Sequence, residues 1–183
     1  MRIEQTPLVD CFIVHEKVHG DARGYFIETF NQRDFNAGSG LDILFVQDNQ
    51  SRSSKGVLRG LHMQRGASAQ AKLVRVLEGS VLDIAVDLRK GSPSFGQHFA
   101  IELTADNHKQ FFVPAGFAHG FVVLSDAATF FYKVDKFYEP SNEVGIMYND
   151  KDLNIDWKLA DSEIILSEKD KTLGSFADYA ASL

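Results

Sequence analysis

The chain has 183 residues, and we expect one domain over residues 1–183. Lysine and arginine total 19 against 25 aspartates and glutamates, so the net charge of −6 argues against non-specific binding of nucleic acid or an anionic membrane. Cys11 is the only cysteine, which excludes an intrachain disulfide and a cysteine-based zinc site. We find neither a signal-peptide pattern at the N-terminus nor an apolar stretch of membrane-spanning length, so we expect a cytoplasmic protein.

The first element predicted along the chain is a short helix at residues 31–37, which ends at the Gly38-Ser39-Gly40 break. Residues 51–56 are polar and predict a turn. From residue 72 onward, β-branched and aromatic runs predict short strands at 72–77, 81–88, 98–103, 111–113, 121–124 and 130–134.

The alternation of side chains refines these strands. In residues 81–88, aliphatic side chains alternate with residues that include Asp83 and Asp87, and this period of two predicts a half-buried strand. Strands spaced about ten residues apart favour a β-sandwich or barrel. A helical spacing near the end of the chain predicts a C-terminal amphipathic helix, from Leu173, Phe176, Ala177 and Ala180.

Two of the six histidines lie in informative motifs. His62 belongs to RGLHMQ (59–64), directly after the predicted polar turn, and His119 ends PAGFAH (114–119) between two apolar strands. The P-x-G-x-x-H spacing of the second motif resembles the second motif of the cupin superfamily, a double-sheet jelly roll with an internal pocket. The first cupin motif normally supplies H-x-H and a glutamate as metal ligands, but here Gln64 replaces the second histidine. We therefore expect no metal, and a histidine used for proton transfer.

A wider resemblance extends through the chain. Seven segments, in this order, resemble the dTDP-4-dehydrorhamnose 3,5-epimerase family: DARGYFIETF (21–30), VQDNQSRS (46–53), RGLHMQ (59–64), QAKLVRVLEGSVLDIAVDLRKGSPSFG (70–96), FFVPAGFAHGFVVLSD (111–126), YKVDKFYEP (132–140) and LSEKD (166–170). The resemblance implies a mainly β, cupin-like jelly roll (a double-stranded β-helix) with a few short helices, including a C-terminal one.

The resemblance also implies a reaction, the inversion of C3 and C5 of dTDP-4-dehydro-6-deoxy-D-glucose to give dTDP-4-dehydro-L-rhamnose in dTDP-L-rhamnose biosynthesis. The C4 ketone acidifies both C–H bonds, so a base and an acid suffice, and we expect no cofactor. By resemblance His62 is the base, Tyr132 the acid, Asp170 the carboxylate that orients His62, and Lys72 the cation that stabilises the enolate.

Further positions match the family's substrate contacts. By resemblance, Tyr138 stacks on thymine, and the other binding residues are Arg23, Glu28, Gln47, Asp48, Asn49, Arg59, Lys72, His119, Glu143 and Lys169. In the family the Arg23–Glu28 segment reaches the neighbouring subunit's pocket, which implies a homodimer. Strand alternation alone would place Arg59 and His62 on opposite faces, so we expect a bend or bulge at Gly60.

Three alternatives remain open at this stage. The first is a relative that inverts only one centre of a related dTDP-keto sugar, because such an enzyme can keep the same base and acid. The second is a metal-dependent cupin such as a dioxygenase, against which Gln64 argues. The third is a non-catalytic nucleotide-sugar binder, which would not require His62, Lys72 and Tyr132 together.

Overall fold

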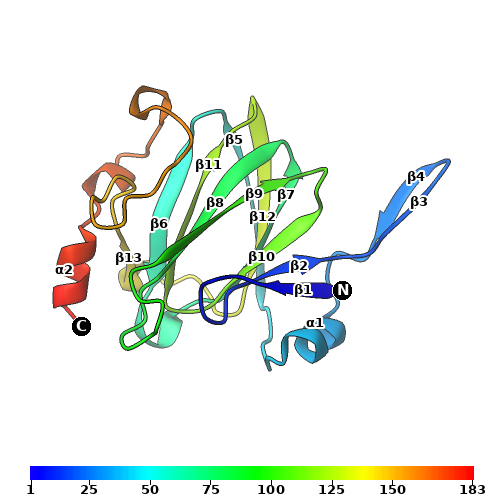
Figure 1. Ribbon diagram of the computed structural model, residues 1–183, viewed down its shortest axis with the longest axis horizontal. Coiled ribbons are helices and arrows are strands. Elements are labelled where there is room, and N and C mark those ends of the chain that lie inside the picture. The colour runs from blue at the N-terminus through cyan, green and yellow to red at the C-terminus, as the bar shows by residue number, and fades with distance from the viewer.

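Two antiparallel β-sheets dominate the computed structural model, which describes residues 1–183 (Figure 1). The six-stranded sheet has, in spatial order, β1 (Arg2–Gln5), β2 (Phe12–His15), β10 (Lys109–Val113), β7 (Lys72–Glu78), β12 (Ala127–Val134) and β5 (Gln47–Ser54). The five-stranded sheet has, in spatial order, β13 (Glu143–Gly145), β6 (Leu58–Gln64), β11 (Phe117–Val123), β8 (Ser80–Asp87) and β9 (His98–Thr104). The prediction of a mainly β protein is confirmed.

The helices are short and lie at the edges of the sandwich. Helix α1 (Gln32–Ser39) starts at Asn31, whose side chain accepts from the backbone N–H of Asp34, and ends at Gly40 in the left-handed conformation. Helix α2 (Phe176–Ala181) confirms the predicted C-terminal helix. Four single turns of 3₁₀ helix complete the set: η1 (Gly66–Ser68), η2 (Pro140–Asn142), η3 (Asp161–Glu163) and η4 (Asp170–Thr172). None of these helices combines the length and the apolar character that a membrane-spanning helix requires.

The structure corrects three details of the predicted strands. Residues 51–54 belong to β5 rather than to a turn, because this edge strand pairs with β12 and carries alternating polar side chains. His119 lies within β11, which begins at Phe117, rather than between two strands. Strand β8 is buried on both faces, so Asp83 and Asp87 are fully buried instead of solvated.

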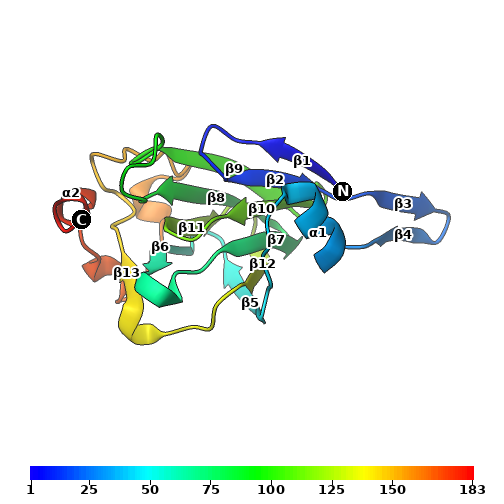
Figure 2. The same cartoon turned by 90° about the horizontal axis from the view of Figure 1, so that it is seen from below.

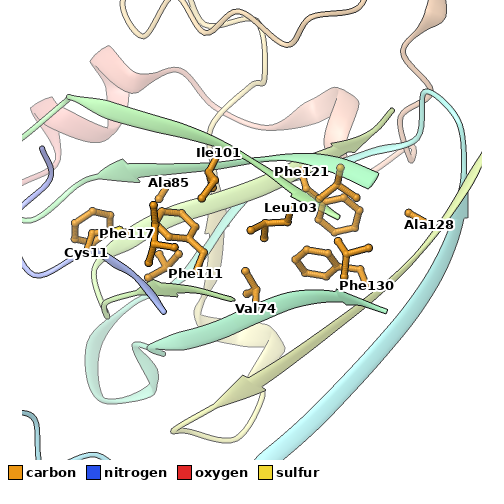
Figure 3. Close-up of a cluster of buried hydrophobic side chains, with 14 of the residues drawn as sticks. Cys11, Val74, Ala85, Ile101, Leu103, Phe111, Phe117, Phe121, Ala128 and Phe130 are labelled. Atoms are coloured by element: carbon orange, nitrogen blue, oxygen red, sulfur yellow. The ribbon is translucent and has the colours of Figure 1, made fainter. Parts of the chain in front are cut away.

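The burial of β8 follows from its two sets of neighbours. One face contributes to the core between the sheets, where the rings of Phe121 and Phe130 stack with centroids 4.1 Å apart (Figure 3). The other face packs under the segment after β13, which brings Leu153 and Trp157 onto it. Each buried large apolar side chain contributes about 1.5–3 kcal/mol, so both clusters hold β8 firmly.

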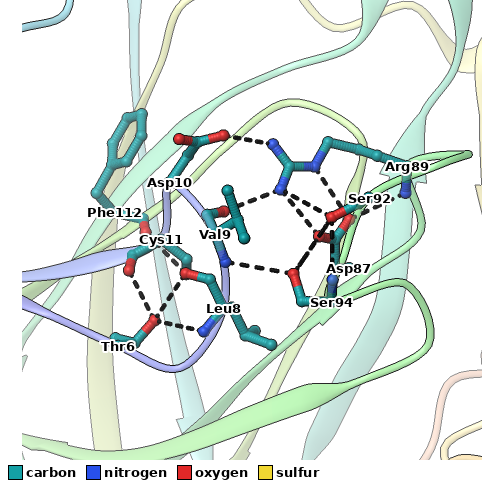
Figure 4. A network of polar contacts seen from close by, with 10 residues as sticks. All are labelled: Thr6, Leu8, Val9, Asp10, Cys11, Asp87, Arg89, Ser92, Ser94 and Phe112. Carbon is teal, nitrogen blue, oxygen red and sulfur yellow. Dashed lines mark hydrogen bonds and ion pairs between the residues drawn. The ribbon is translucent and has the colours of Figure 1, made fainter.

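A polar network fixes the loop after β8 to the N-terminal segment (Figure 4). The Asp87 carboxylate accepts hydrogen bonds from Arg89 Nη2 (2.8 Å), Ser92 Oγ (2.5 Å) and Ser94 Oγ (2.6 Å). Burial opposes ionisation of this carboxyl, but the hydrogen bonds outweigh it and lower the pKa of Asp87 to about 2. Arg89, which is half-buried, also donates to the carbonyl of Val9 at 2.9 Å, so it connects the buried Asp87 carboxylate with the N-terminal segment.

A two-stranded hairpin, β3 (Val18–Asp21) and β4 (Gly24–Ile27), extends away from the sandwich (Figures 1 and 2). Its two strands pair only with each other, and both views show it projecting at the end of the molecule opposite to α2. Tyr25 and Phe26 are 63% and 69% exposed there. A two-stranded hairpin with exposed aromatic rings is marginally stable by itself, so this element needs a further contact surface.

Candidate active site

A pocket of about 560 Å³ lies between the two sheets. Its walls come from β5, β7 and β12 of one sheet, β6 and β11 of the other, and residues 165–170 of the C-terminal segment. The structure brings together these predicted site residues around it: Asn49, Arg59, His62, Lys72, His119, Tyr132, Lys169 and Asp170.

The predicted irregularity in β6 is present and explains how Arg59 and His62 share one pocket. Arg59 pairs with Phe121 and His62 with His119, so the register between β6 and β11 shifts between these pairs. Gly60 has φ +135°, and a Cβ there would lie 2.6 Å from the Cα of Gly120. Only glycine fits this approach of two backbones, and the bulge turns both side chains to the same face.

His62 forms a close pair with Asp170. Its Nε2 lies 2.5 Å from Asp170 Oδ1, and the Asp170 side chain is 4% exposed. Burial lowers the pKa of His62, against the opposing charge and hydrogen bond of Asp170. The imidazole is therefore neutral at neutral pH.

The fold places Asp170 through the contacts of the C-terminal segment. Ile165 forms a parallel bridge with Val57, and Gly174 forms another with Ile146, so the segment is attached on both sides of Asp170. The backbone N–H of Asp170 donates to Ser167 Oγ at 3.1 Å. These attachments explain why a residue 108 positions after His62 can meet it.

Tyr132 and Lys72 lie on the opposite sheet from His62. Tyr132 is on β12 and packs its ring near Phe130, with centroids 6.0 Å apart. Burial raises the pKa of Tyr132, so its hydroxyl remains protonated at neutral pH. Burial lowers the pKa of Lys72 to about 8, opposed by the charges of Asp83 and Glu143, so the ammonium form still dominates at pH 7.

Glu143 connects several predicted residues at the edge of the pocket. Its Oε2 accepts from Tyr138 Oη and from Lys169 Nζ, both at 2.5 Å, and its Oε1 lies 3.9 Å from His62 Nδ1. Burial opposes ionisation of Glu143, but the hydrogen bonds from Lys169 and Tyr138 outweigh it and lower its pKa. Tyr138 is 52% exposed.

Other predicted residues lie outside the pocket wall. Gln47 donates to Asn49 Oδ1 at 2.8 Å, and Asp48 pairs with Lys133 at 2.9 Å, so both are neighbours of the wall on β5. Arg23 is on the projecting hairpin, where it pairs with Asp21. Glu28 follows the hairpin and accepts from Asn31 at 3.3 Å. The structure does not bring Arg23 or Glu28 to the pocket of their own chain.

Gln64, which stands at a ligand position of metal-binding cupins, is used for structure here. Its amide donates to the carbonyls of Ser68 (2.8 Å) and Phe137 (3.3 Å), and it accepts from the N–H of Glu139 (2.5 Å). No three His, Cys, Asp or Glu side chains gather in a way that could hold a metal ion. The buried amide therefore anchors the 137–139 segment beside the pocket.

Asp83 is a residue near the site that sequence reasoning missed. Its Oδ1 lies 2.9 Å from Nε2 of His119, and the carboxyl group is fully buried. The signal was present in the sequence as an acidic residue inside an apolar strand. Strand alternation predicts a solvated face at this position, and the structure shows a buried one.

The fold and the pocket define an enzyme that moves protons, an isomerase with a cupin-like jelly roll. A sequence model described as dTDP-4-dehydrorhamnose 3,5-epimerase matches residues 5–178. The dTDP-4-dehydrorhamnose 3,5-epimerase of Pseudomonas aeruginosa is 51% identical over 178 residues, which cover 97% of both chains. The chain belongs to the dTDP-4-dehydrorhamnose 3,5-epimerase family.

Solved structures agree with this assignment. The crystal structure of dTDP-4-dehydrorhamnose 3,5-epimerase from Elizabethkingia anophelis is 54% identical, with a TM-score of 0.94 over 97% of both chains. The 3,5-epimerase of Legionella pneumophila, in complex with dTDP-4-keto-L-rhamnose, is 45% identical, with a TM-score of 0.92 over 97% of this chain and 96% of that one. A 3′-monoepimerase from Streptomyces bikiniensis, in complex with dTDP-quinovose, is 30% identical over 97% of this chain and 88% of that one, with a TM-score of 0.88. The predicted jelly roll and the predicted isomerase of dTDP-L-rhamnose biosynthesis are confirmed.

Proposed function

We propose that this pocket inverts C3 and C5 of dTDP-4-dehydro-6-deoxy-D-glucose with His62 as base and Tyr132 as acid. The observation that carries the proposal is their placement: His62 is on β6 of one sheet and Tyr132 on β12 of the other, and both line one pocket. Inversion of a carbon requires that the proton leaves from one face and returns to the other. Groups on facing sheets satisfy this requirement.

Each inversion has two proton transfers. Neutral His62 takes the proton from a carbon next to the C4 ketone, and the bonding electrons move to the C4 oxygen as an enolate. The Lys72 ammonium stabilises that oxygen, an interaction often worth several kcal/mol in a water-poor site. Tyr132 then gives its proton to the opposite face of the carbon, and the ketone forms again. The pKa directions support these roles, since His62 is a free base and Tyr132 a protonated acid at neutral pH.

The pocket also offers what an anionic nucleotide requires. Arg59, Lys72 and Lys169 bring three cationic side chains to one cavity of an acidic protein. We assign Arg59 and Lys169 to the diphosphate, with Tyr138 as the platform for thymine. The remaining predicted contacts, Gln47, Asp48, Asn49, His119 and Glu143, would position the nucleoside and the sugar. The exposure of Tyr138 supports the stacking role because the residue is accessible to a ligand.

Deuterium incorporation tests the reaction. The keto sugar is incubated with the protein in heavy water, and we expect deuterium at both C3 and C5. Deuterium at only one carbon would place this chain with the single-centre epimerases. As a control for binding, His62→Ala should reduce turnover by about 10²–10⁴-fold while dTDP affinity remains within a few-fold of the unmodified protein. An equal loss of turnover and of dTDP affinity in His62→Ala would favour a purely structural role for His62.

We further propose a homodimer in which the Arg23–Glu28 segment completes the partner's pocket. The projecting hairpin, the exposed rings of Tyr25 and Phe26, and the distance of Arg23 from its own pocket support this arrangement. An exposed apolar patch of this kind indicates a protein contact surface.

Subunit complementation tests the shared site. Arg23→Ala and His62→Ala chains should each have little activity alone, but mixed dimers contain one complete pocket. A random mixture of equal amounts should recover about a quarter of the unmodified activity, since half the dimers are mixed and each has one working site. No recovery after subunit exchange, or a monomer by sedimentation, would overturn the shared site.

A further inference from the structure

The 3₁₀ turn that carries Asp170 is shaped by hydrogen bonds within itself. The N–H of Asp170 donates to Ser167 Oγ at 3.1 Å, and the N–H of Thr172 donates to the carbonyl of Lys169 at 3.1 Å. These bonds determine the form of the turn but not its distance from the sheets. Contacts with the sandwich must therefore set the 2.5 Å approach of Asp170 to His62.

Leu173 and Asp170 project from the same side of this turn. Leu173 ends η4 and lies three residues after Asp170, and side chains at this spacing are eclipsed in a 3₁₀ helix. Burial agrees with this geometry, because Asp170 is buried and Leu173 half-buried, whereas Lys171 and Thr172 between them are exposed. The turn thus presents one carboxylate and one apolar side chain to the sandwich.

Gly145 of β13 receives the side chain of Leu173. A Cβ at Gly145 would lie 2.8 Å from Leu173 Cδ2 and 2.9 Å from Leu173 Cδ1, so the two methyl groups fill the space that a side chain at this position would take. Gly145 is also the register partner of His62 on β6. The turn therefore contacts two paired positions of neighbouring strands, with Asp170 at His62 and Leu173 at Gly145.

We propose that Leu173 is a positioning residue for the reaction, whose contact with Gly145 holds Asp170 at His62. The inference rests on the proposed function of His62 as the base. Leu173 does not line the pocket, so it acts through Asp170. Gly145 itself is unsuitable for the test, because a Cβ there would also lie 2.5 Å from the carbonyl oxygen of Leu61 on β6. The test therefore changes Leu173.

Displacement of Asp170 has a measurable consequence for His62. Burial lowers the pKa of His62, and Asp170 is the first of the groups that oppose this change. A carboxylate that moves away opposes it less, so the pKa of His62 falls further and the imidazole becomes a weaker base. The other titratable and charged groups around His62 come from every neighbouring element: Glu143 on β13, Arg59 on β6, Lys72 on β7, His119 on β11, Tyr132 on β12 and Lys169 in the C-terminal segment.

The first test is the pH dependence of kcat/KM in Leu173→Ala. We expect the acidic limb of the profile to move down by about half to one pH unit, and the plateau to fall about 5–20-fold. Both changes should be smaller than in Asp170→Asn, because the carboxylate is displaced and not removed. Affinity for dTDP should stay within about threefold, so that the loss falls on kcat. Leu173→Met keeps the apolar volume and should retain the unmodified profile.

Leu159→Ala is the matched control. Leu159 is another half-buried leucine of the C-terminal segment, and it packs against the cluster that contains Trp157. Its truncation should lower the melting temperature about as much as Leu173→Ala, while the acidic limb and the plateau stay in place. Equal changes of the pH profile in both variants would show a general loosening of the segment and would overturn the inference.

A second measurement does not depend on turnover. The pKa of His62, followed through the ring C–H resonances in NMR, should be about half to one unit lower in Leu173→Ala than in the unmodified protein, and unchanged in Leu159→Ala. If Leu173→Ala does not fold, Leu173→Val removes one carbon and should give a smaller change in the same direction. An unchanged pKa of His62 in the folded variant, or an unmoved acidic limb, would overturn the inference. If the unmodified protein does not turn over the keto sugar, the proposed function fails, while the NMR titration still decides whether Leu173 holds Asp170 at His62.

Discussion

The pairing of His62 with Asp170 gives the most incisive test of the proposed chemistry, through the variant Asp170→Asn. The substitution keeps the size of a side chain that is only 4% exposed and removes its charge from Nε2, 2.5 Å away. Asparagine can no longer compensate a positive imidazole. The base form of His62 is then favoured at every pH, but it is a weaker base.

The magnitude follows from the geometry. A hydrogen-bonded opposite charge at this distance commonly changes a pKa by about 1–3 units. Because burial already lowers the pKa of His62, loss of Asp170 lowers it further, and the change corresponds to about 1.4–4 kcal/mol of proton affinity. The acidic limb of kcat/KM should move down by the same 1–3 pH units, while the plateau falls by about 10²–10⁴-fold.

The assay is deuterium incorporation into the keto sugar across the acidic pH range. Glu168→Gln is a suitable control, because Glu168 is close in sequence, its side chain is 90% exposed and it pairs with Lys171 rather than His62. Its profile should match that of the unmodified protein. A plateau within about twofold of the unmodified rate, with an unmoved acidic limb, would refute the assignment of the pair.

Other substitutions test the remaining features. Tyr132→Phe keeps the packed ring and removes the hydroxyl that we propose as the acid, so turnover should fall about 10²–10⁴-fold. The melting temperature should stay within a few degrees of that of the unmodified protein. An unchanged rate would exclude Tyr132 as the acid. Gly60→Ala should lower the free energy of unfolding, measured in urea, by about 2–4 kcal/mol, because the new Cβ would lie 2.6 Å from Gly120 Cα. Gly24→Ala is the control, since Gly24 has a similar φ of +130° but open space around it. Equal losses in the two variants would show that backbone conformation alone matters. Asp87→Asn removes a carboxyl group whose pKa is lowered to about 2 in the folded protein, so the variant's free energy of unfolding should be about 2–3 kcal/mol lower above pH 4. The difference from the unmodified protein should disappear as the pH falls through 2. A loss of stability that is independent of pH would contradict the ionic role of Asp87.

The strands were predictable because their signal is local. The alternation in β9 places Ile101 and Leu103 inside and Glu102 outside, as the structure shows, since one side of this edge strand faces solvent. The same alternation in β8 was misleading. Periodicity records the two faces of a strand but not what later covers them. The face with Asp83 and Asp87 points into the core between the sheets, and the segment around Trp157 covers the aliphatic face.

The sequence by itself, through motifs that resemble one family and follow its order along the chain, indicated the family, the jelly roll and the residues that we propose for the acid–base chemistry. It also indicated that Gly60 must relieve a conflict between Arg59 and His62, because strand geometry does not permit both on one face otherwise. Each motif is short, but the family assignment combines motifs from residue 21 to residue 170.

The tertiary structure shows how side chains from distant segments meet, which the sequence indicated only through the family resemblance. Asp170 reaches His62 from 108 residues away because two bridges attach the C-terminal segment to the sandwich, and no local pattern encodes that contact. It also decided that Asp83 is buried against His119 and that Arg23 lies away from its own pocket. The net charge of −6 likewise does not tell where charges gather, since the field in a pocket depends on the distances between side chains and is screened by salt over about 10 Å.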